Sequence, residues 1–260
     1  MTALDIELTL GDAARPPLVF LHEGLGSLGL WRSFPVDVCA AYGNPTALVY
    51  SRAGYGRSPV VREPRAVDYM HREALDVLPA LLAEHAIDRP VLVGHSDGAS
   101  IALIHAGAGH AVGGVVVIAP HVFVEDVSIA GIDAARRAYC DDDGGDLRDR
   151  LARHHDDVDA TFRGWNDVWL SPAFRSWNIE SYLPGITAPV LAIQGRDDTY
   201  GTLAQLDAIE AGVRGRCERF VVDGGGHVLH TGPHAPLVVG RIATFVRSLD
   251  ERTAWTPTPG

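Results

Sequence analysis

The chain has 260 residues, 47% of them hydrophobic, which is enough apolar material for one substantial core. Its formal net charge is −11, and every one of its 22 basic residues other than histidine is an arginine. This charge repels nucleic acid and anionic membrane surfaces, so we expect neither as a partner. The lack of lysine also excludes P-loop, Schiff-base and Tyr-x-x-x-Lys reductase chemistry.

The three cysteines, Cys39, Cys140 and Cys217, are scattered and odd in number, which argues against a disulfide framework. The first ten residues alternate polar and apolar side chains without a cationic region, as a strand does and a signal peptide does not. No apolar run is long enough to span a membrane. We therefore expect a cytoplasmic protein.

The first half of the chain alternates strand and helix patterns. The sequence predicts an edge strand over 4–10, buried strands over 17–21 and 46–50, and helices over 31–42 and 67–86. A further strand, turn and helix over 90–103 and a buried strand over 112–119 follow. Alternating elements of this kind predict an α/β fold, with a mainly parallel sheet and helices on both of its faces.

The composition changes over 120–185, where acidic and aromatic residues increase and strand patterns disappear. Helical segments within this stretch are separated by residues 141–145, and the sheet resumes at 189–194. A helix over 202–211, a strand over 219–222 and a helix over 236–249 complete the pattern. We expect a core of residues 1–119 and 186–250, a helical insertion over 120–185, and a flexible tail over 251–260.

One serine stands at the apex of the strand, turn and helix over 90–103. The turn reads Gly94-His95-Ser96-Asp97-Gly98, a Gly-x-Ser-x-Gly pattern. Its glycines let the strand and the helix pass each other closely, which presents the Ser96 hydroxyl to a substrate carbonyl.

This segment resembles the nucleophile elbow of the α/β-hydrolase family, and its Ser-Asp-Gly sequence resembles the biphenyl-hydrolase-like and carboxylesterase-like branch. The resemblance spans the chain except its tail. It implies a mostly parallel central sheet flanked by helices, with a helical cap inserted after the sixth strand, here over 120–185. It also implies that an acid and then a histidine follow the serine, each after a core strand.

Both residue types occur in the expected order. Of the 12 histidines, His227 alone follows a glycine turn at a strand end, in Asp223-Gly224-Gly225-Gly226-His227. Two acids follow the strand over 189–194. The family's acid stands three residues after a glycine, which favours Asp198 after Gly195 and leaves Asp197 as the alternative.

Backbone N–H groups must also stabilise the oxyanion of a tetrahedral intermediate. The resemblance assigns one to Asp97 and the other to Gly24, or to Leu25, in a loop similar to the family's His-Gly-x-x-Gly. Glu23 replaces the usual glycine there, either pairing with an arginine or facing the substrate. The Asp97 side chain either stabilises the N-terminus of its helix or attracts a cationic ammonium group of the substrate.

Aromatic side chains provide candidates for the substrate pocket. Trp165 and Trp169 lie four residues apart, on one face of a predicted helix, and Trp31 follows the oxyanion loop. With Glu23 and Leu25 they form the expected pocket set.

The sequence therefore predicts a serine hydrolase that cleaves a small or medium carboxylic ester through an acyl-enzyme, with no metal and no organic cofactor. Lactone opening and carbon–carbon bond hydrolysis are alternatives on the same three residues. A non-catalytic receptor on this fold is a third. The fourth is an NADP-dependent reductase, because residues 24–29 match Gly-x-Gly-x-x-Gly and Arg52 follows the next strand.

Overall fold

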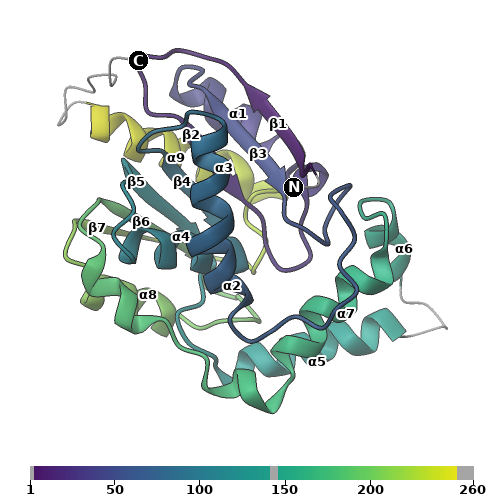
Figure 1. The fold of residues 1–260 in the computed structure, drawn as a ribbon. Helices are drawn as coiled ribbons and strands as arrows, with labels where there is room; N and C mark the ends of the chain where they lie inside the picture. Colours follow the sequence, from purple (N-terminus) through teal and green to yellow (C-terminus); the bar gives the residue numbers. More distant parts are fainter. Residues whose placement is uncertain (1–2, 141–145, 251–260) are drawn as a thin grey trace.

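The computed structural model of the chain describes residues 3–140 and 146–250, so the segment 141–145 and the expected tail 251–260 lie outside the described residues. Within these residues, seven strands form one sheet in the order β1-β3-β2-β4-β5-β6-β7 (Figure 1). The strands are β1 (Asp5–Thr9), β2 (Leu18–Leu21), β3 (Ala47–Ser51), β4 (Val91–His95), β5 (Gly114–Ile118), β6 (Val190–Gly195) and β7 (Cys217–Val222).

The pairing directions confirm the mainly parallel sheet. β1 runs antiparallel to β3, and every other pair is parallel. Each residue of β2 to β6 is buried, because helices cover both faces, whereas the edge strand β1 is half exposed. This explains why the inner strands are continuous apolar runs and β1 alternates.

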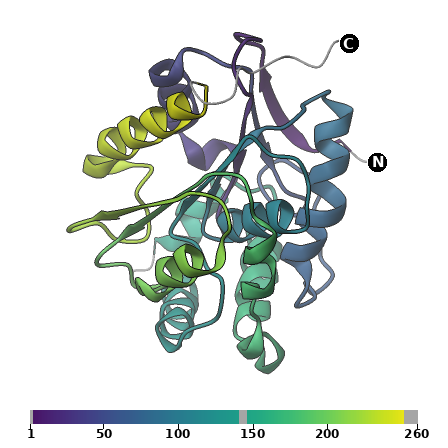
Figure 2. The same cartoon turned by 90° about the vertical axis from the view of Figure 1, so that its left-hand side faces the viewer.

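Helices lie on both faces of the sheet (Figure 2), and a hydrophobic cluster fills each side. On one side α1 (Phe34–Tyr42) and α9 (Ala235–Asp250) pack on each other and on the strands. The other side carries α3 (Leu78–Glu84), α4 (Asp97–Gly107) and α8 (Ala204–Gly212). Successive strand residues alternate between the two clusters, as the pleat requires.

Two predicted helices begin or continue differently from the expectation. The helix predicted over 31–42 begins at Phe34, because Arg32 has a φ of +53° that ends the preceding 3-10 turn (Leu28–Trp31). The helix predicted over 67–86 consists of α2 (Tyr69–Arg72), a π-helical turn (Glu73–Val77) and α3. Pro79, at the start of α3, has no N–H to donate the α-helical hydrogen bond to the preceding turn. Its missing donor favours the π-helical turn at this place.

The stretch 120–185, here called the inserted segment, is helical as expected. It contains α5 (Asp126–Cys140), α6 (Leu147–Ala152), α7 (Val158–Trp169) and 3-10 turns over Pro172–Ser176 and Glu180–Gly185. In Figure 1 its helices α5, α6 and α7 lie together, on the opposite side of the molecule from α1 and α9.

The inserted segment follows β5, the fifth strand of this chain, and not a sixth strand as expected. The reason is that the sheet begins with a single antiparallel edge strand, since no further strand forms between β1 and β2. None of the helices in the described part of the chain combines the length and the apolarity that crossing a bilayer requires.

Candidate active site

The turn between β4 and α4 holds Ser96 in an uncommon backbone conformation. Its φ is +52° and its ψ is −115°, values that a non-glycine residue rarely adopts. The flanking glycines make the turn possible. A Cβ on Gly94 would lie 2.3 Å from the Gly98 carbonyl oxygen, and one on Gly98 would lie 1.9 Å from the Leu21 carbonyl oxygen. The strand and helix could not approach this closely with larger residues.

Three side chains from separate loops meet at this turn. His227, beyond β7, places Nε2 3.0 Å from the Ser96 hydroxyl oxygen. Its Nδ1 lies 3.0 Å from both carboxylate oxygens of Asp198, which follows β6. Because a carboxylate only accepts hydrogen bonds, Nδ1 carries the proton and Nε2 presents its lone pair to the hydroxyl. This arrangement can remove a proton from the serine.

The Asp198 carboxylate is held in its charged form. Its side chain is 1% exposed, and it accepts hydrogen bonds from the Tyr200 N–H and the Gln194 amide as well as from His227. Burial alone would favour the neutral acid, but the contacts with His227 and the Tyr200 N–H outweigh it and lower the pKa of Asp198. Asp197 is exposed, and within the residues that the structure describes only its N–H is hydrogen-bonded, to the Gly225 carbonyl.

Two rings beside His227 were not identified from the sequence. The centroids of the Tyr200 and His121 rings lie 4.6 and 5.9 Å from that of His227. Burial and the proximity of His227 lower the pKa of His121 to about 3, so this ring is neutral. The only signal in the sequence is that His121 follows β5 at the sheet edge where the other site residues lie.

Both expected oxyanion donors have a free N–H in the described part of the chain. In residues 3–140 and 146–250, no protein group accepts a hydrogen bond from the N–H of Gly24 or Asp97, and the Leu25 N–H is equally available. Asp97 also begins α4, so its N–H lies at the positive end of that helix.

Arg52 fixes the loop that carries Gly24. Its guanidinium is 1% exposed and donates to the carbonyl oxygens of His22 at 2.7 Å and Glu23 at 3.0 Å. It lies over the Tyr55 ring and 3.8 Å from the Asp97 carboxylate. Arg52 therefore points into the protein, which removes the 2′-phosphate contact on which the reductase alternative depends.

The Asp97 carboxylate is fully buried. It accepts a hydrogen bond from the Tyr69 hydroxyl at 2.5 Å, and the Trp169 indole donates to the same hydroxyl. Burial raises the pKa of Asp97, against the opposing influence of Arg52 and Tyr69. These contacts anchor the start of α4 and connect it to the inserted segment.

The five expected pocket residues have different surroundings. Trp165 of α7 lies directly on Gly24, and Trp169 packs in the core through Tyr69. Leu25 is half-buried, and its carbonyl oxygen accepts a hydrogen bond from His155 Nε2. Trp31 is not in a pocket, because its ring stacks on Phe34 in the core beside α1.

Glu23 does not pair with an arginine through its side chain. Arg52 binds its backbone carbonyl, and its carboxylate lies 3.4 Å from His95 Nδ1. The His95 ring is fully buried at the end of β4, in the position directly before Ser96.

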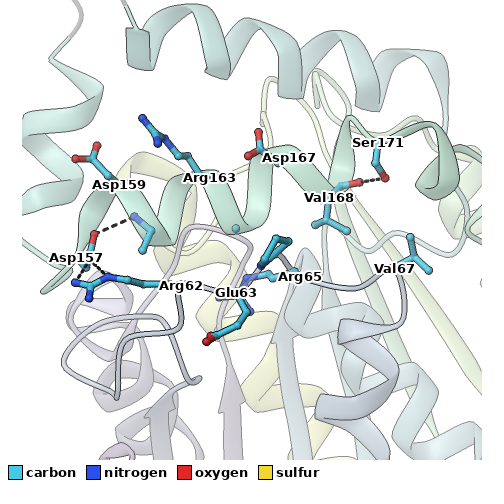
Figure 3. A pocket seen from close by; sticks show the side chains of 13 residues that line it. Arg62, Glu63, Arg65, Val67, Asp157, Asp159, Arg163, Asp167, Val168 and Ser171 are labelled. Carbon is cyan, nitrogen blue, oxygen red and sulfur yellow. Dashed lines mark hydrogen bonds and ion pairs between the residues drawn. The ribbon is translucent and has the colours of Figure 1, made fainter.

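A groove of about 510 Å³ lies between α7 and the loop over 61–67 (Figure 3). Charged side chains of both signs line it, and Arg62 pairs with Asp157 across it. Arg65 separates this groove from the interior, since its guanidinium lies over the Tyr55 and Tyr69 rings. None of Ser96, Asp198 and His227 lines the groove.

We expect Gly24→Ala to lower kcat/KM by about 10²–10³, because alanine keeps the N–H but moves it from the position expected of an oxyanion donor. The added Cβ would lie 2.0 Å from Trp165 Nε1, so either the loop or the indole must move. Gly24→Ala combined with Trp165→Leu should lose less than the sum of the single changes, because the second change removes the collision. Gly29→Ala is the control, since its Cβ meets only His154, at 3.5 Å. Strictly additive losses would contradict this contact.

The protein should lose stability in mild acid. Burial lowers the pKa of His105 to about 4 and that of His121 to about 3. Below pH 6.5 the unfolded chain binds protons at both positions and the folded protein does not, so the free energy of unfolding falls as the pH falls. Each histidine contributes about 1.4 kcal/mol per pH unit down to its folded pKa. The lowered pKa of Asp198 acts in the same direction.

Urea unfolding at pH 7.0 and 5.5 measures this loss, which we expect to be about 2–3 kcal/mol for the two histidines together. His105→Gln should reduce the difference between the two pH values by about 1.2 kcal/mol, and the lowered pKa values of His22 and His230 keep part of the pH dependence in the variant. An unfolding free energy that is equal at both would show that these rings titrate normally.

Comparisons with known proteins agree with this architecture. The model of the alpha/beta hydrolase family matches residues 18–239. A search of curated protein sequences finds no match. A proline iminopeptidase from Mycobacterium smegmatis superposes with a TM-score of 0.72 at 16% identity, over 95% of both chains.

Two esterases are also similar in structure. One, from Thermogutta terrifontis, has a TM-score of 0.68 at 15% identity, covering 95% of this chain and 93% of that one. The other, RhEst1 from Rhodococcus sp. ECU1013, has a TM-score of 0.65 at 21% identity, covering 94% and 95%. At these identities the likeness shows the fold alone. With the family match across most of its length, the chain belongs to the alpha/beta hydrolase family.

Proposed function

We propose that this protein is a serine hydrolase that cleaves a small or medium carboxylic ester, with Ser96, His227 and Asp198 as its catalytic triad. The unbroken hydrogen-bond chain from the Ser96 hydroxyl through His227 to the Asp198 carboxylate carries the proposal. A serine becomes nucleophilic when a positioned base takes its proton, and the base is effective when a carboxylate fixes its tautomer.

In the proposed reaction, His227 Nε2 takes the Ser96 proton as the serine oxygen attacks the ester carbonyl. The N–H groups of Gly24 and Asp97 stabilise the oxyanion that forms. The C–O bond to the alcohol then breaks, and His227 returns the proton to the departing oxygen. A water molecule then attacks the acyl-enzyme carbonyl as His227 takes one of its protons. The bond to the Ser96 oxygen breaks, and His227 returns the proton to Ser96 as the acid leaves.

The inserted segment acts in this proposal as a cap that limits substrate size. The Trp165 indole lies against Gly24, so an acyl group bound at the oxyanion loop meets α7 immediately. A boundary of this kind fits small and medium acyl groups better than long ones.

Labelling with an organophosphonate tests the nucleophile. We expect one adduct per chain, at Ser96, and none in Ser96→Ala. A chain that takes up no label would be a binding protein on this fold, not an enzyme. A panel of nitrophenyl esters of graded acyl length, run beside lactones and a vinylogous diketone acid, then tests the reaction class. We expect the short and medium esters to have the highest kcat/KM. If lactones or the diketone acid are turned over faster, the reaction assigned to this protein changes to lactone opening or carbon–carbon bond hydrolysis.

The substrate in this proposal needs no cationic amino group. The Asp97 side chain is closed off from solvent, and its Oδ2 accepts from the Tyr69 hydroxyl and lies 3.8 Å from Arg52, which favours an anchoring role. Its Oδ1 is buried without a hydrogen-bond partner in the described part of the chain. We expect an amino-acid ester and its N-acylated analogue to be hydrolysed with kcat/KM values within about threefold. A clear preference for the free amine would reassign Asp97 to ammonium recognition.

We further propose that the protein works in the cytoplasm. The three cysteines are free, and burial raises the pKa of the Cys39 and Cys217 thiols to about 11, which keeps both protonated. Cell fractionation with an antibody to the chain tests this location.

A further inference from the structure

Three side chains with metal-binding atoms lie close together near His227. Glu23 comes from the oxyanion loop, His95 from the end of β4, and His230 from the loop after β7. One ligand atom from each lies within 4.8 Å of the other two. The three belong to separate segments of the chain, so the fold alone brings them together.

The surroundings of His95 define which of its ring nitrogens is free. Its Nε2 lies 3.0 Å from the backbone carbonyl oxygen of His227. A carbonyl only accepts, so Nε2 carries a hydrogen. In the neutral ring, Nδ1 therefore presents a lone pair, and it does so 3.4 Å from a carboxylate oxygen of Glu23.

His230 has the same arrangement. It donates to the Leu30 carbonyl, and its Nδ1 is buried without a partner in the described part of the chain. The donor is therefore Nε2, which again leaves a lone pair on Nδ1. His230 is 4% exposed, and its ring lies 4.9 Å from that of His95. Two lone pairs and a carboxylate thus face one another inside the protein.

Metal-binding histidines are arranged in this way. The ring nitrogen that does not bind the ion typically donates to a backbone carbonyl, which fixes the tautomer and the orientation of the ring. Both His95 and His230 have this outer contact already. A cation between the three groups would satisfy all of them at once.

We propose that Glu23, His95 and His230 bind one divalent transition-metal ion of the zinc class. Two imidazoles and one carboxylate form a donor set that zinc prefers over magnesium or calcium. Neighbouring ligand atoms around a tetrahedral zinc lie about 3.3 Å apart, close to the 3.4 Å between His95 and Glu23. The Glu23 carboxylate folds over Gly26, where a side chain would displace it, since a Cβ would lie 2.4 Å from its oxygen.

The bound ion would tie the oxyanion loop to the loop that carries His227. The Glu23 side chain is 21% exposed, which provides a route from solvent, whereas His95 is fully enclosed. Ser96 contacts His227 Nε2, and the ring of His227 lies 5.1 Å from that of His95 and belongs to none of the three proposed ligands. Its role is to hold the two loops in place, and it takes no part in bond breaking.

The test uses the full chain, stripped with a chelator and then dialysed against Zn²⁺ alone. We expect one tightly bound zinc per chain in the wild type and in Ser96→Ala, which separates this site from the proposed hydrolysis. The melting temperature should rise by about 5–10 °C at a 100-fold excess over Kd. Glu23→Gln and His230→Gln should each weaken zinc binding by more than about 100-fold. Loss of a group that only orients a metal ligand typically weakens binding by about 10–100-fold, and these variants remove the ligands themselves. His234→Gln, a half-buried histidine in the next turn, is the matched control and should bind as the wild type does.

Co²⁺ substitution of the wild type provides a second readout, which reports the coordination geometry. The wild type should show the intense visible absorption of a four-coordinate cobalt site, and Gly26→Ala should weaken it. Zinc binding equal in the wild type and in Glu23→Gln would overturn the proposal, as would a weak, octahedral cobalt spectrum. The cluster would then be an imidazolium–carboxylate pair without an ion.

Discussion

Asp198→Asn is expected to lower kcat by about 10⁴ while leaving the fold intact. The Asp198 carboxylate accepts from His227 Nδ1 and so keeps the lone pair on Nε2, facing Ser96. An amide at this position can donate to Nδ1, which stabilises the opposite tautomer, with the hydrogen on Nε2. The histidine then cannot take the serine proton, although every atom remains in place.

Asp197→Asn is the matched control, because Asp197 is the adjacent acid and is exposed. We expect its kcat to stay within about threefold of the wild type. Steady-state hydrolysis of a nitrophenyl ester, with thermal melting as the check on folding, measures both variants. If Asp197→Asn loses far more activity than Asp198→Asn, the two roles are reversed.

Arg52→Met is expected to destabilise the protein by about 3–5 kcal/mol, the cost of removing one partner from a buried set of charges. The Asp97 carboxylate, 0% exposed, and the Glu73 carboxylate, 8% exposed, would lose their nearest buried cation. The variant also frees the carbonyl oxygens of His22 and Glu23, so the oxyanion loop loses its anchor. We expect kcat of the folded fraction to fall by about 10².

Arg52→Lys separates the two effects. Lysine restores the positive charge, but its single ammonium group cannot hold both carbonyls in the geometry of the guanidinium fork. It should recover part of the stability and little of the activity. Arg62→Met is the control, since the Arg62 side chain is 77% exposed and its pair with Asp157 contributes less than about 1 kcal/mol. Urea unfolding and ester kinetics measure all three, and full activity in Arg52→Met would refute the anchoring role.

The fold was predictable because its signals are local. Continuous apolar runs predicted the inner strands, and all of them occur, since a strand covered on both faces has no polar side. Details that depend on one backbone torsion or one missing donor were not predictable. The late start of α1 after Arg32 and the π-helical turn before Pro79 are examples. The prediction that the inserted segment follows a sixth strand was wrong by one strand, because that number came from the family resemblance and this chain has five strands before the segment.

The candidate site was predictable where glycines mark a turn. Gly94 and Gly98 identified Ser96, and the glycines before His227 separated it from the other histidines. Side chains whose role depends on distant partners were not identifiable. Arg52 was considered only as a nucleotide contact, yet it is the buried anchor of the oxyanion loop. Trp31 and Trp165 looked alike in the sequence, but one packs in the core and the other on Gly24.

The sequence by itself determined the order of strands and helices, the parallel sheet and the serine at its elbow, because side-chain periodicity and glycine spacing act over a few residues. Only the tertiary structure decided which side chains meet. His227 and Ser96 are 131 residues apart, and His95 and Glu23 are 72 apart. Such contacts depend on how the strands stack in register and on which rotamers the packed core permits, and neither can be derived from local patterns.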